Sequence, residues 1–320
     1  MDLAKKVIGA ELEMFEKHFK NAVKSRVSLL DRIMQYIVKR KGKQMRPMFV
    51  LLSAKLHGEI NDSSYRAASL VELLHTATLV HDDVVDEALE RRGYFSINAL
   101  WKNKIAVLVG DYLLSKGLLL SLDNKDFEIL TILSNAVKKM SEGELLQIEK
   151  TRNLNFDESI YYEIINGKTA SLLASSCAAG ASSVSKDFDI IEKMRAFGDA
   201  LGMAFQIKDD LFDYGEAKVG KPTGNDIKEK KLTLPLIHIL QKVAPSLKKE
   251  IIHIVKNNNN DKTKVKFVMD HVVQYGGIEY ATQKMIEYRD QALQILYSFP
   301  VSPTRDALEE LVRYTTDRRY

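Results

Sequence analysis

The sequence predicts an all-α fold built as a single large helical bundle, and three observations carry this prediction. Apolar residues recur at three- and four-residue steps through most of the 320 residues, which is the spacing of one face of an α-helix. No proline occurs between Pro47 and Pro222, although one proline inside a helix costs about 3 kcal/mol. No Asn-Gly or Asp-Gly pair joins two alternating apolar runs, as a β-hairpin would require. We therefore expect residues 1–320 to form one domain.

Helices are predicted in chain order from this spacing. In residues 64–87 the apolar step runs through Ala67, Leu70, Val71 and Leu74. The same step predicts helices over residues 105–121, 127–148, 168–179 and 190–212, with further helices over 241–302. Loops are expected at residues 41–47, 215–231 and 257–261, where glycine, proline or asparagine gather.

Composition narrows the class of protein. Hydrophobic residues make up 45% of the chain, which excludes disorder, and a net charge of +4 is too small to indicate a nucleic-acid partner. Cys177 is the only cysteine, so an intrachain disulfide and a cysteine metal cluster are both excluded. The first residues lack the apolar core of a secretory signal, and no uncharged apolar run reaches the roughly 18–20 residues of a membrane span. We expect a cytoplasmic protein.

Two carboxylate clusters stand at the ends of predicted helices and share one pattern, with aspartates at i, i+1 and i+4. The first is Asp82, Asp83 and Asp86, and the second is Asp209, Asp210 and Asp213. Residues at i and i+4 lie one turn apart on the same helix face, and like charges there destabilise an isolated helix by roughly 0.2–0.5 kcal/mol per pair. A cation is expected to offset this repulsion. Mg²⁺ suits such sites because it takes oxygen ligands and commonly bridges to substrate phosphates.

Basic residues accompany both clusters. Taken singly, each is most often a solvated surface charge, but together with the acids they indicate two phosphate-binding sites. Lys168 and Thr169 follow Gly167 at an expected helix start, where backbone donors also favour anions. The other basic residues singled out are Lys43 and Arg46 before the first cluster, Arg91 and Arg92 after it, and Lys221, Lys230 and Lys231 after the second.

These residues resemble the motifs of the trans-type isoprenyl (polyprenyl) diphosphate synthases of medium and long chain length. The matching segments, in family order, are residues 42–47, 81–93, 143–147, 167–169, 206–213 and 220–235. The resemblance implies the isoprenoid synthase type I fold, in which helices surround a central active-site cavity, and a homodimer. It also implies that isopentenyl diphosphate and an allylic diphosphate are the substrates, that Mg²⁺ ions (three per site) are the cofactors, and that a membrane is contacted only through the product.

The resemblance assigns a role to each motif residue. Asp82, Asp83, Asp86, Asp209 and Asp213 would hold Mg²⁺, with Asp210 supporting them. Arg91, Lys168, Lys221 and Lys231 would contact the allylic diphosphate. Lys43, Arg46, His75 and Arg92 would hold isopentenyl diphosphate, while Thr169 and Gln206 would flank the reacting carbons. The resemblance assigns no such role to His81, for which a structural and a functional role are equally expected.

Product length is expected to depend on an apolar tunnel below the first cluster. Ala77 and Thr78 lie four and five residues before it, about 6–7.5 Å along the helix axis at 1.5 Å per residue. Both are small where shorter-chain relatives carry an aromatic plug, which predicts a product of about C30–C40 for a quinone side chain. The tunnel floor would involve Leu74, Leu108 or residues 132–136.

Other functions remain open at this point. His75 and the His81-Asp82 pair would suit a metallophosphohydrolase of the histidine–aspartate type, but that hypothesis leaves the second cluster unexplained. Geranylgeranyl or farnesyl diphosphate synthesis, a terpene cyclase and a noncatalytic subunit of a heteromeric synthase are further alternatives. The second cluster disfavours a cyclase, and the presence of both clusters disfavours a noncatalytic subunit.

Overall fold

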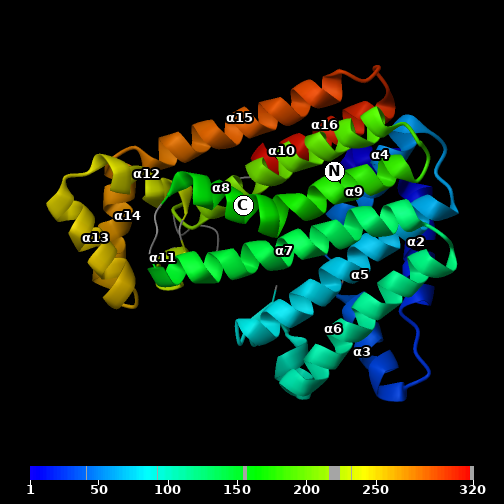
Figure 1. Cartoon of the computed structure of the whole chain (residues 1–320), viewed down its shortest axis with the longest axis horizontal. Helices are drawn as coiled ribbons and strands as arrows, with labels where there is room; N and C mark the ends of the chain where they lie inside the picture. Colours follow the sequence, from blue (N-terminus) through cyan, green and yellow to red (C-terminus); the bar gives the residue numbers. More distant parts are fainter. Residues whose placement is uncertain (41, 92, 154–156, 216–223, 232, 318–320) are drawn as a thin grey trace. The chain divides into compact units, whose positions relative to one another are not determined.

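The computed structural model describes residues 1–317 except 41, 92, 154–156, 216–223 and 232. The prediction of an all-α fold is confirmed, because helices make up 82% of the structure and the strands are very short (Figure 1). The strands described are β1 (Glu90–Arg91) and β2 (Tyr94–Phe95), which pair antiparallel in a short hairpin.

The chain divides into two compact units. Unit 1 comprises Met1–Val137, Ser175–Arg195 and Pro300–Leu308, and unit 2 comprises Lys138–Ala174, Ala196–Phe299 and Glu309–Tyr320. Four of the five boundaries fall within helices, namely α7 (Phe127–Asn153), α9 (Ser171–Ser182), α10 (Phe188–Phe212) and α16 (Pro303–Asp317), and the fifth lies between Phe299 and Pro300. The expectation of one domain over residues 1–320 stays a prediction.

The first six helices belong to unit 1. Their bounds are α1 (Asp2–Val7), α2 (Gly9–Ala22), α3 (Ser28–Lys39), α4 (Met45–His57), α5 (Asp62–Val85) and α6 (Ile97–Asp123). A capping box between Asn61 and Ser64 starts α5, since each side chain accepts a backbone N–H of the other. Helices α5 and α6 pack side by side (Figure 1). The close approach requires Gly117, where an added Cβ would lie 2.7 Å from the Leu70 side chain.

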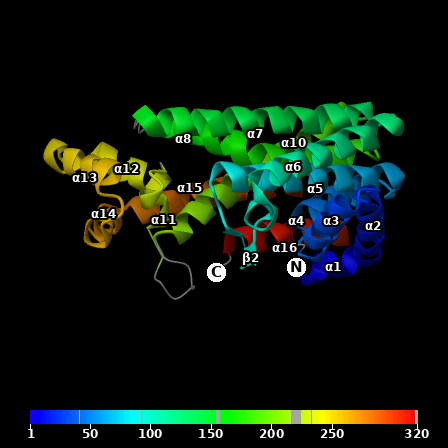
Figure 2. The same ribbon diagram turned by 90° about the horizontal axis from the view of Figure 1, so that it is seen from below.

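The remaining helices complete the two units. Their bounds are α7 (Phe127–Asn153), α8 (Glu158–Ile165), the π-helix η1 (Asn166–Ala170), α9 (Ser171–Ser182), α10 (Phe188–Phe212), α11 (Asn225–Lys228), α12 (Leu234–Lys242), α13 (Pro245–Asn257), α14 (Lys262–Gln274), α15 (Gly277–Tyr297) and α16 (Pro303–Asp317). In unit 2, α13 lies beside α14, and their apolar faces share a core with α12 (Figures 1 and 2).

Three expectations about local structure were wrong. Helix α4 begins at Met45, so the loop predicted over 41–47 ends earlier, and Pro47 lies in the first helical turn, where its missing N–H costs nothing. Lys168 does not start a helix, because α8, η1 and α9 follow one another without a break. The backbone donors of a helix N-terminus are therefore not available there. The loop predicted over 215–231 contains the short helix α11.

Helix α6 is apolar enough to draw comparison with a membrane span. It is the one helix in the described residues that passes a test of length and composition, with a mean hydropathy of 1.7 over 18 residues, of which 33% are buried. Lys104, Asp111 and Lys116 interrupt its apolar sequence, and its backbone is non-helical at Lys102, where φ is 73°. The test alone is weak evidence for a membrane.

Candidate active site

The first aspartate motif closes α5 in unit 1. Asp86 is the C-cap residue, and its backbone N–H still donates to the Asp82 carbonyl at 2.8 Å, so the one-turn spacing of Asp82 and Asp86 persists past the helix end. Asp82 is half-buried and Asp86 is exposed. Asp83 differs from both, because its position continues the buried stripe of Leu73, Ala77 and Val80 and it is only 4% exposed.

Arg91 compensates the buried charge of Asp83. The guanidinium Nε of Arg91, on strand β1, donates to Asp83 Oδ1 at 2.7 Å. The side-chain amide of Asn98, at the start of α6, donates to the Asp83 carbonyl oxygen at 3.1 Å and ties the same point to the next helix. The structure thus brings together two of the predicted site residues and places a third, unpredicted one beside them. Arg92 lies outside the described residues.

Two of the predicted isopentenyl diphosphate contacts also meet in unit 1. Arg46 Nη1 lies 2.8 Å from His75 Nε2. A guanidinium can only donate, so this nitrogen of His75 is the acceptor of the contact. Lys43 stands on the exposed segment before α4, three residues from Arg46.

The His81 ring packs against α6 and is not paired with Asp82 as a metallophosphohydrolase site would require. Its Nε2 lies 3.3 Å from the Val107 carbonyl oxygen and 3.5 Å from Asp111 Oδ1, both on α6. Gly110 makes room for the ring, since an added Cβ there would lie 2.1 Å from His81 Nε2. These contacts support a structural part for His81 in the packing of α5 against α6.

The second aspartate motif closes α10 in unit 2 and repeats the burial pattern of the first. Asp210 continues the buried stripe of Met203 and Ile207 and is 8% exposed, whereas Asp209 is exposed and Asp213 is half-buried. Both oxygens of Asp210 are occupied: Tyr161 Oη donates to Oδ2 at 2.8 Å, and Gln206 Nε2 donates to Oδ1 at 2.8 Å. In each motif the middle aspartate is therefore buried and held by its neighbours.

Burial sets the charge state of Asp210. Loss of solvation raises its pKa to about 8, and the nearby Asp226 adds to this, while the hydrogen bonds from Gln206 and Tyr161 oppose it. Among the residues that the structure describes, no cation is paired with Asp210 in the way that Arg91 is paired with Asp83. In the absence of metal ions, Asp210 is consequently neutral over much of the physiological pH range.

Asp213 anchors the segment that follows α10. Its carboxylate accepts the backbone N–H groups of Asn225 at 2.9 Å and Asp226 at 3.0 Å, at the start of α11. Burial raises the pKa of Asp213, and burial together with Asp213 raises the pKa of Asp226 to about 6. Lys231 Nζ lies 3.7 Å from Asp226 and 2.5 Å from Glu229. Lys221, predicted to act beside Lys231, lies outside the described residues.

Lys168 and Thr169 lie in the π-helical turn η1, opposite α7. Lys168 Nζ contacts Glu144 at 2.5 Å and Gln147 at 3.4 Å. Thr169 Oγ1 donates to Gln206 Oε1 at 2.7 Å, which links this turn to Asp210 through Gln206. The backbones approach closely at two glycines: an added Cβ on Gly143 would lie 2.9 Å from the Lys168 nitrogen, and one on Gly167 would lie 2.9 Å from the Lys139 carbonyl oxygen.

The residues proposed to set product length lie in unit 1 with mixed exposure. Ala77 is fully buried, and so, within a few per cent, are Leu74, Ile132 and Ala136; Thr78 is half-buried. Leu108 was expected as a possible tunnel floor, but its side chain is 55% exposed. Because Leu108 lies on the outward face of α6, it does not close an interior space within a single chain.

The outer carboxylates suit a hard cation by the chemistry of their donors. Asp82, Asp86, Asp209 and Asp213 offer only oxygen, and each oxygen of Asp213 keeps a lone pair beyond the backbone N–H it accepts. Within the described residues, no three histidine, cysteine or acidic side chains gather closely enough to hold a metal without other ligands. Mg²⁺ usually takes one or two carboxylates and completes its shell with water and substrate phosphate.

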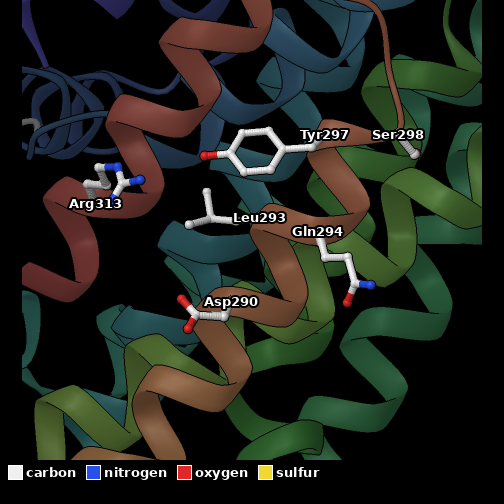
Figure 3. A pocket seen from close by; sticks show the side chains of 6 residues that line it. All are labelled: Asp290, Leu293, Gln294, Tyr297, Ser298 and Arg313. Carbon is white, nitrogen blue, oxygen red and sulfur yellow. The ribbon is translucent and has the colours of Figure 1, made fainter.

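A groove between α15 and α16 lies apart from these residues in unit 2. It is lined by Asp290, Leu293, Gln294, Tyr297, Ser298 and Arg313, and Figure 3 shows the Tyr297 ring and the Arg313 guanidinium on either side of it. Arg313 is already paired with Glu309 on its own helix at 2.9 Å. None of the predicted site residues that the structure describes lines this groove.

Comparison with known proteins identifies the family. Residues 27–272 match the polyprenyl synthetase family. The chain belongs to this family. Among curated relatives, it is 34% identical over 314 residues to an all-trans-nonaprenyl-diphosphate synthase of Rhodobacter capsulatus, covering 97% of this chain and 96% of that one. It is 32% identical to heptaprenyl diphosphate synthase component 2 of Bacillus subtilis, covering 99% and 91% of the two chains.

A solved structure gives the same result. A polyprenyl synthase of Caulobacter crescentus, crystallised with calcium and isoprenyl diphosphate, superposes with a TM-score of 0.91 at 32% identity, covering 100% of this chain and 98% of that one. The interpretation of the chain as a chain-elongating trans-prenyltransferase with the isoprenoid synthase fold is confirmed. The metallophosphohydrolase hypothesis has no support left.

Sequence reasoning missed two residues that hold the aspartates, Tyr161 and Asn98. Tyr161 is 49 positions from the carboxylate it contacts, so no spacing rule connects them. The sequence nevertheless indicates that each of these aspartates needs a hydrogen-bond donor. The apolar stripes that end at Asp83 and Asp210 predict a buried carboxylate in each motif, and a buried carboxylate requires a donor.

Proposed function

We propose that this polyprenyl synthetase condenses isopentenyl diphosphate with farnesyl or geranylgeranyl diphosphate to give an all-trans polyprenyl diphosphate of about C30–C40, consistent with a quinone side chain, in the cytoplasm. The observation that carries this proposal is the repeated arrangement of the two aspartate motifs. In both, the middle carboxylate is buried and held in place, which leaves the outer carboxylates, at the helix end, for ligand binding.

The outer carboxylates would hold Mg²⁺, which when bound supplies positive charge to the departing diphosphate. Asp86 and Asp209 provide exposed oxygens, and Asp82 and Asp213 add half-buried ones. In this scheme the main part of Asp83 and Asp210 is to fix the ends of their helices, through the hydrogen bonds that they accept. Binding of the metal ions falls mainly to the outer carboxylates. Three metal ions per site, as the family resemblance implies, would need the substrate phosphates as shared ligands.

The cationic side chains would stabilise the negative charge that develops when the allylic C–O bond breaks. Lys168 is held over η1 by Glu144 and Gln147, and Arg91 by Asp83, so both reach their positions before substrate binds. The Arg46–His75 pair, with Lys43 close in sequence, would bind the second diphosphate. Thr169 and Gln206, bonded to each other, would line the space near the reacting carbons.

The experiment that tests this function uses the purified chain with Mg²⁺, labelled isopentenyl diphosphate and each allylic primer in turn. Products longer than C20 are expected after removal of the diphosphate, sized by chromatography. Products that stop at C15 or C20 would support the alternative of farnesyl or geranylgeranyl diphosphate synthesis. No product from the chain alone, with activity restored by a second protein, would support a heteromeric synthase.

Product length provides a sharper test. Ala77 is fully buried on α5, and a phenyl ring there would fill any tunnel that runs beneath Asp82 and Asp83. We expect Ala77→Phe to shorten the main product by at least one or two isoprene units. A product distribution unchanged from that of the parent enzyme would reject the tunnel argument. Thr78→Ser, which keeps a small side chain on the next residue, is the matched control.

A homodimer is proposed from the outward face of α6. Large apolar side chains there are 41–55% exposed, namely Leu100, Val107, Leu108, Leu118, Leu119 and Leu122. A second copy of the same helix would remove this apolar surface from water. Sedimentation should give a dimer, and Leu118→Glu should give a monomer. Val301→Glu is the control, because Val301 is 77% exposed on a different part of unit 1.

A further inference from the structure

The hairpin that carries Arg91 needs support from outside itself. Its strands are two residues long, and its second strand is open to solvent, with Tyr94 51% and Phe95 56% exposed. Gly93 in its turn has a φ of 76°, in the left-handed region. A lone two-stranded hairpin is at best marginally stable in water. Something else must hold Arg91 at its place beside Asp83.

Helix α3 supplies that support through Tyr36. The Tyr36 hydroxyl donates to the Phe95 carbonyl oxygen at 2.6 Å, across 59 residues of sequence. The Tyr36 ring also meets the edge of Trp101 on α6, with the ring centres 5.2 Å apart and the planes 86° to each other. Tyr36 thus contacts both β2 and the helix that follows it.

Arg40, the C-cap residue of α3, lies between two aromatic rings. Its guanidinium carbon is 3.4 Å from the centre of the Tyr36 ring and 4.4 Å from the centre of the Tyr94 ring. Its Nη1 donates to the Tyr36 hydroxyl. A cation over an aromatic face is attracted by the ring quadrupole. Arg40 therefore binds the exposed Tyr94 side chain to α3.

The hairpin transmits this support to the aspartate motif. Tyr94, under Arg40, is the direct partner of Arg91 in the β1–β2 register, and Glu90 is the partner of Phe95. The Ser96 hydroxyl donates to the Ala88 carbonyl oxygen at 2.7 Å and closes the base of the hairpin. Arg91 then reaches Asp83 at 2.7 Å.

We propose that Tyr36 and Arg40 are positioning residues for the prenyl transfer reaction. They hold the β1–β2 hairpin so that Arg91 stays in place for the allylic diphosphate. The functional half of this inference rests on the proposed function of Arg91, whereas the structural half does not. Neither Tyr36 nor Arg40 belongs to an aspartate motif or to the basic segments that the sequence singled out.

The structural half is tested by hydrogen exchange of residues 88–97 in the protein without substrate or metal. Tyr36→Phe removes two hydrogen bonds, the one to the Phe95 carbonyl oxygen and the one from Arg40, whereas Arg40→Leu removes the cation and the second of these bonds. Each variant should speed exchange there about fivefold, and the double variant should speed it more than either one but less than about 25-fold, because the two side chains contact each other. Arg40→Lys should restore part of the protection. The control is Tyr112→Phe, which removes a bond of the same kind, from a phenol to the Lys24 carbonyl oxygen at 3.0 Å.

The functional half is tested by kinetics of the same variants. The double variant should raise KM for the allylic primer about fivefold or more, while kcat and the KM for isopentenyl diphosphate change less than about twofold. Unchanged exchange in the hairpin, or equally faster exchange throughout α5, would overturn the proposal. Faster hairpin exchange with an unchanged allylic KM would overturn the positioning role. If the parent enzyme makes no prenyl product, the proposed function fails, and hydrogen exchange still decides the structural half.

Discussion

Gly143 offers a direct test of how α7 and the Lys168 turn fit together. In Gly143→Ala, the new methyl would lie 2.9 Å from the Lys168 nitrogen and 3.2 Å from two backbone carbons of Gly167. Ordinary contacts begin near 3.4 Å, so η1 must retreat by about half an ångström, and no flexible side chain is there to yield. Overpacking of this kind costs about 1–3 kcal/mol. Alanine regains up to about 1 kcal/mol of helix propensity, which leaves a net loss of about 0–2 kcal/mol relative to the parent protein.

The same displacement should reduce turnover. Lys168 moves with the η1 backbone, and a misplacement of about 1 Å at a reacting group can cost on the order of 100-fold in rate. We expect kcat/KM for the allylic primer to fall about tenfold in Gly143→Ala. Stability is measured by urea unfolding followed by circular dichroism, and activity by incorporation of labelled isopentenyl diphosphate.

Gly9→Ala is the matched control, because a methyl added at Gly9 would meet nothing within 4 Å. It should be as stable as the parent protein or slightly more so, with full activity. The reasoning is refuted if Gly143→Ala behaves like Gly9→Ala in both measurements. That result would mean that α7 and η1 are not in the close contact that the two glycines indicate.

Two further predictions concern buried ionisable groups. Because the folded-state pKa of Asp210 is about 8 against 3.8 for its ordinary value, its contribution to stability is fully present below pH of about 4 and is lost as the pH rises to about 8. In EDTA, the free energy of unfolding of Asp210→Asn, measured with urea, should rise relative to that of the parent protein by on the order of 5 kcal/mol between these two pH values. The prediction is contradicted if the unfolding free energies of the two proteins change with pH in the same way. Cys177 is fully buried, and burial raises its pKa to about 12, so iodoacetamide should label it only in the unfolded protein. Rapid labelling of native protein, seen by mass spectrometry, would show that α9 is poorly packed.

Sequence spacing was sufficient for the helices and for the position of the aspartates along them. Helix α5 spans Asp62–Val85 against a prediction of 64–87, and α10 ends at Phe212 as expected. Periodicity succeeds there because burial of one helix face decides both the residue pattern and the structure. It could not distinguish a helix start from a π-helical turn at Lys168, since both place polar residues after Gly167.

The partners of the aspartates were beyond prediction for a different reason. The contacts of Asp83 with Arg91, of Asp210 with Tyr161, and of the hairpin with α3 depend on which elements pack together. A single sequence gives no information on such long-range pairing. What it does give is the apolar stripe, which ends in a carboxylate at Asp83 and at Asp210 and so indicates that a donor must be found for each.

The Asp83–Arg91 pair has a consequence for how the enzyme is assembled. A buried anion that waits for a metal ion would make folding depend on that ion, as it does in small zinc domains. Here Arg91 is the counterion of Asp83. At Asp210 the raised pKa favours the neutral carboxyl group, and Tyr161 and Gln206 hydrogen-bond to it. Neither buried carboxylate therefore requires a metal ion to balance its charge, and we expect the protein to remain folded in EDTA and to recover activity when a divalent metal ion is restored.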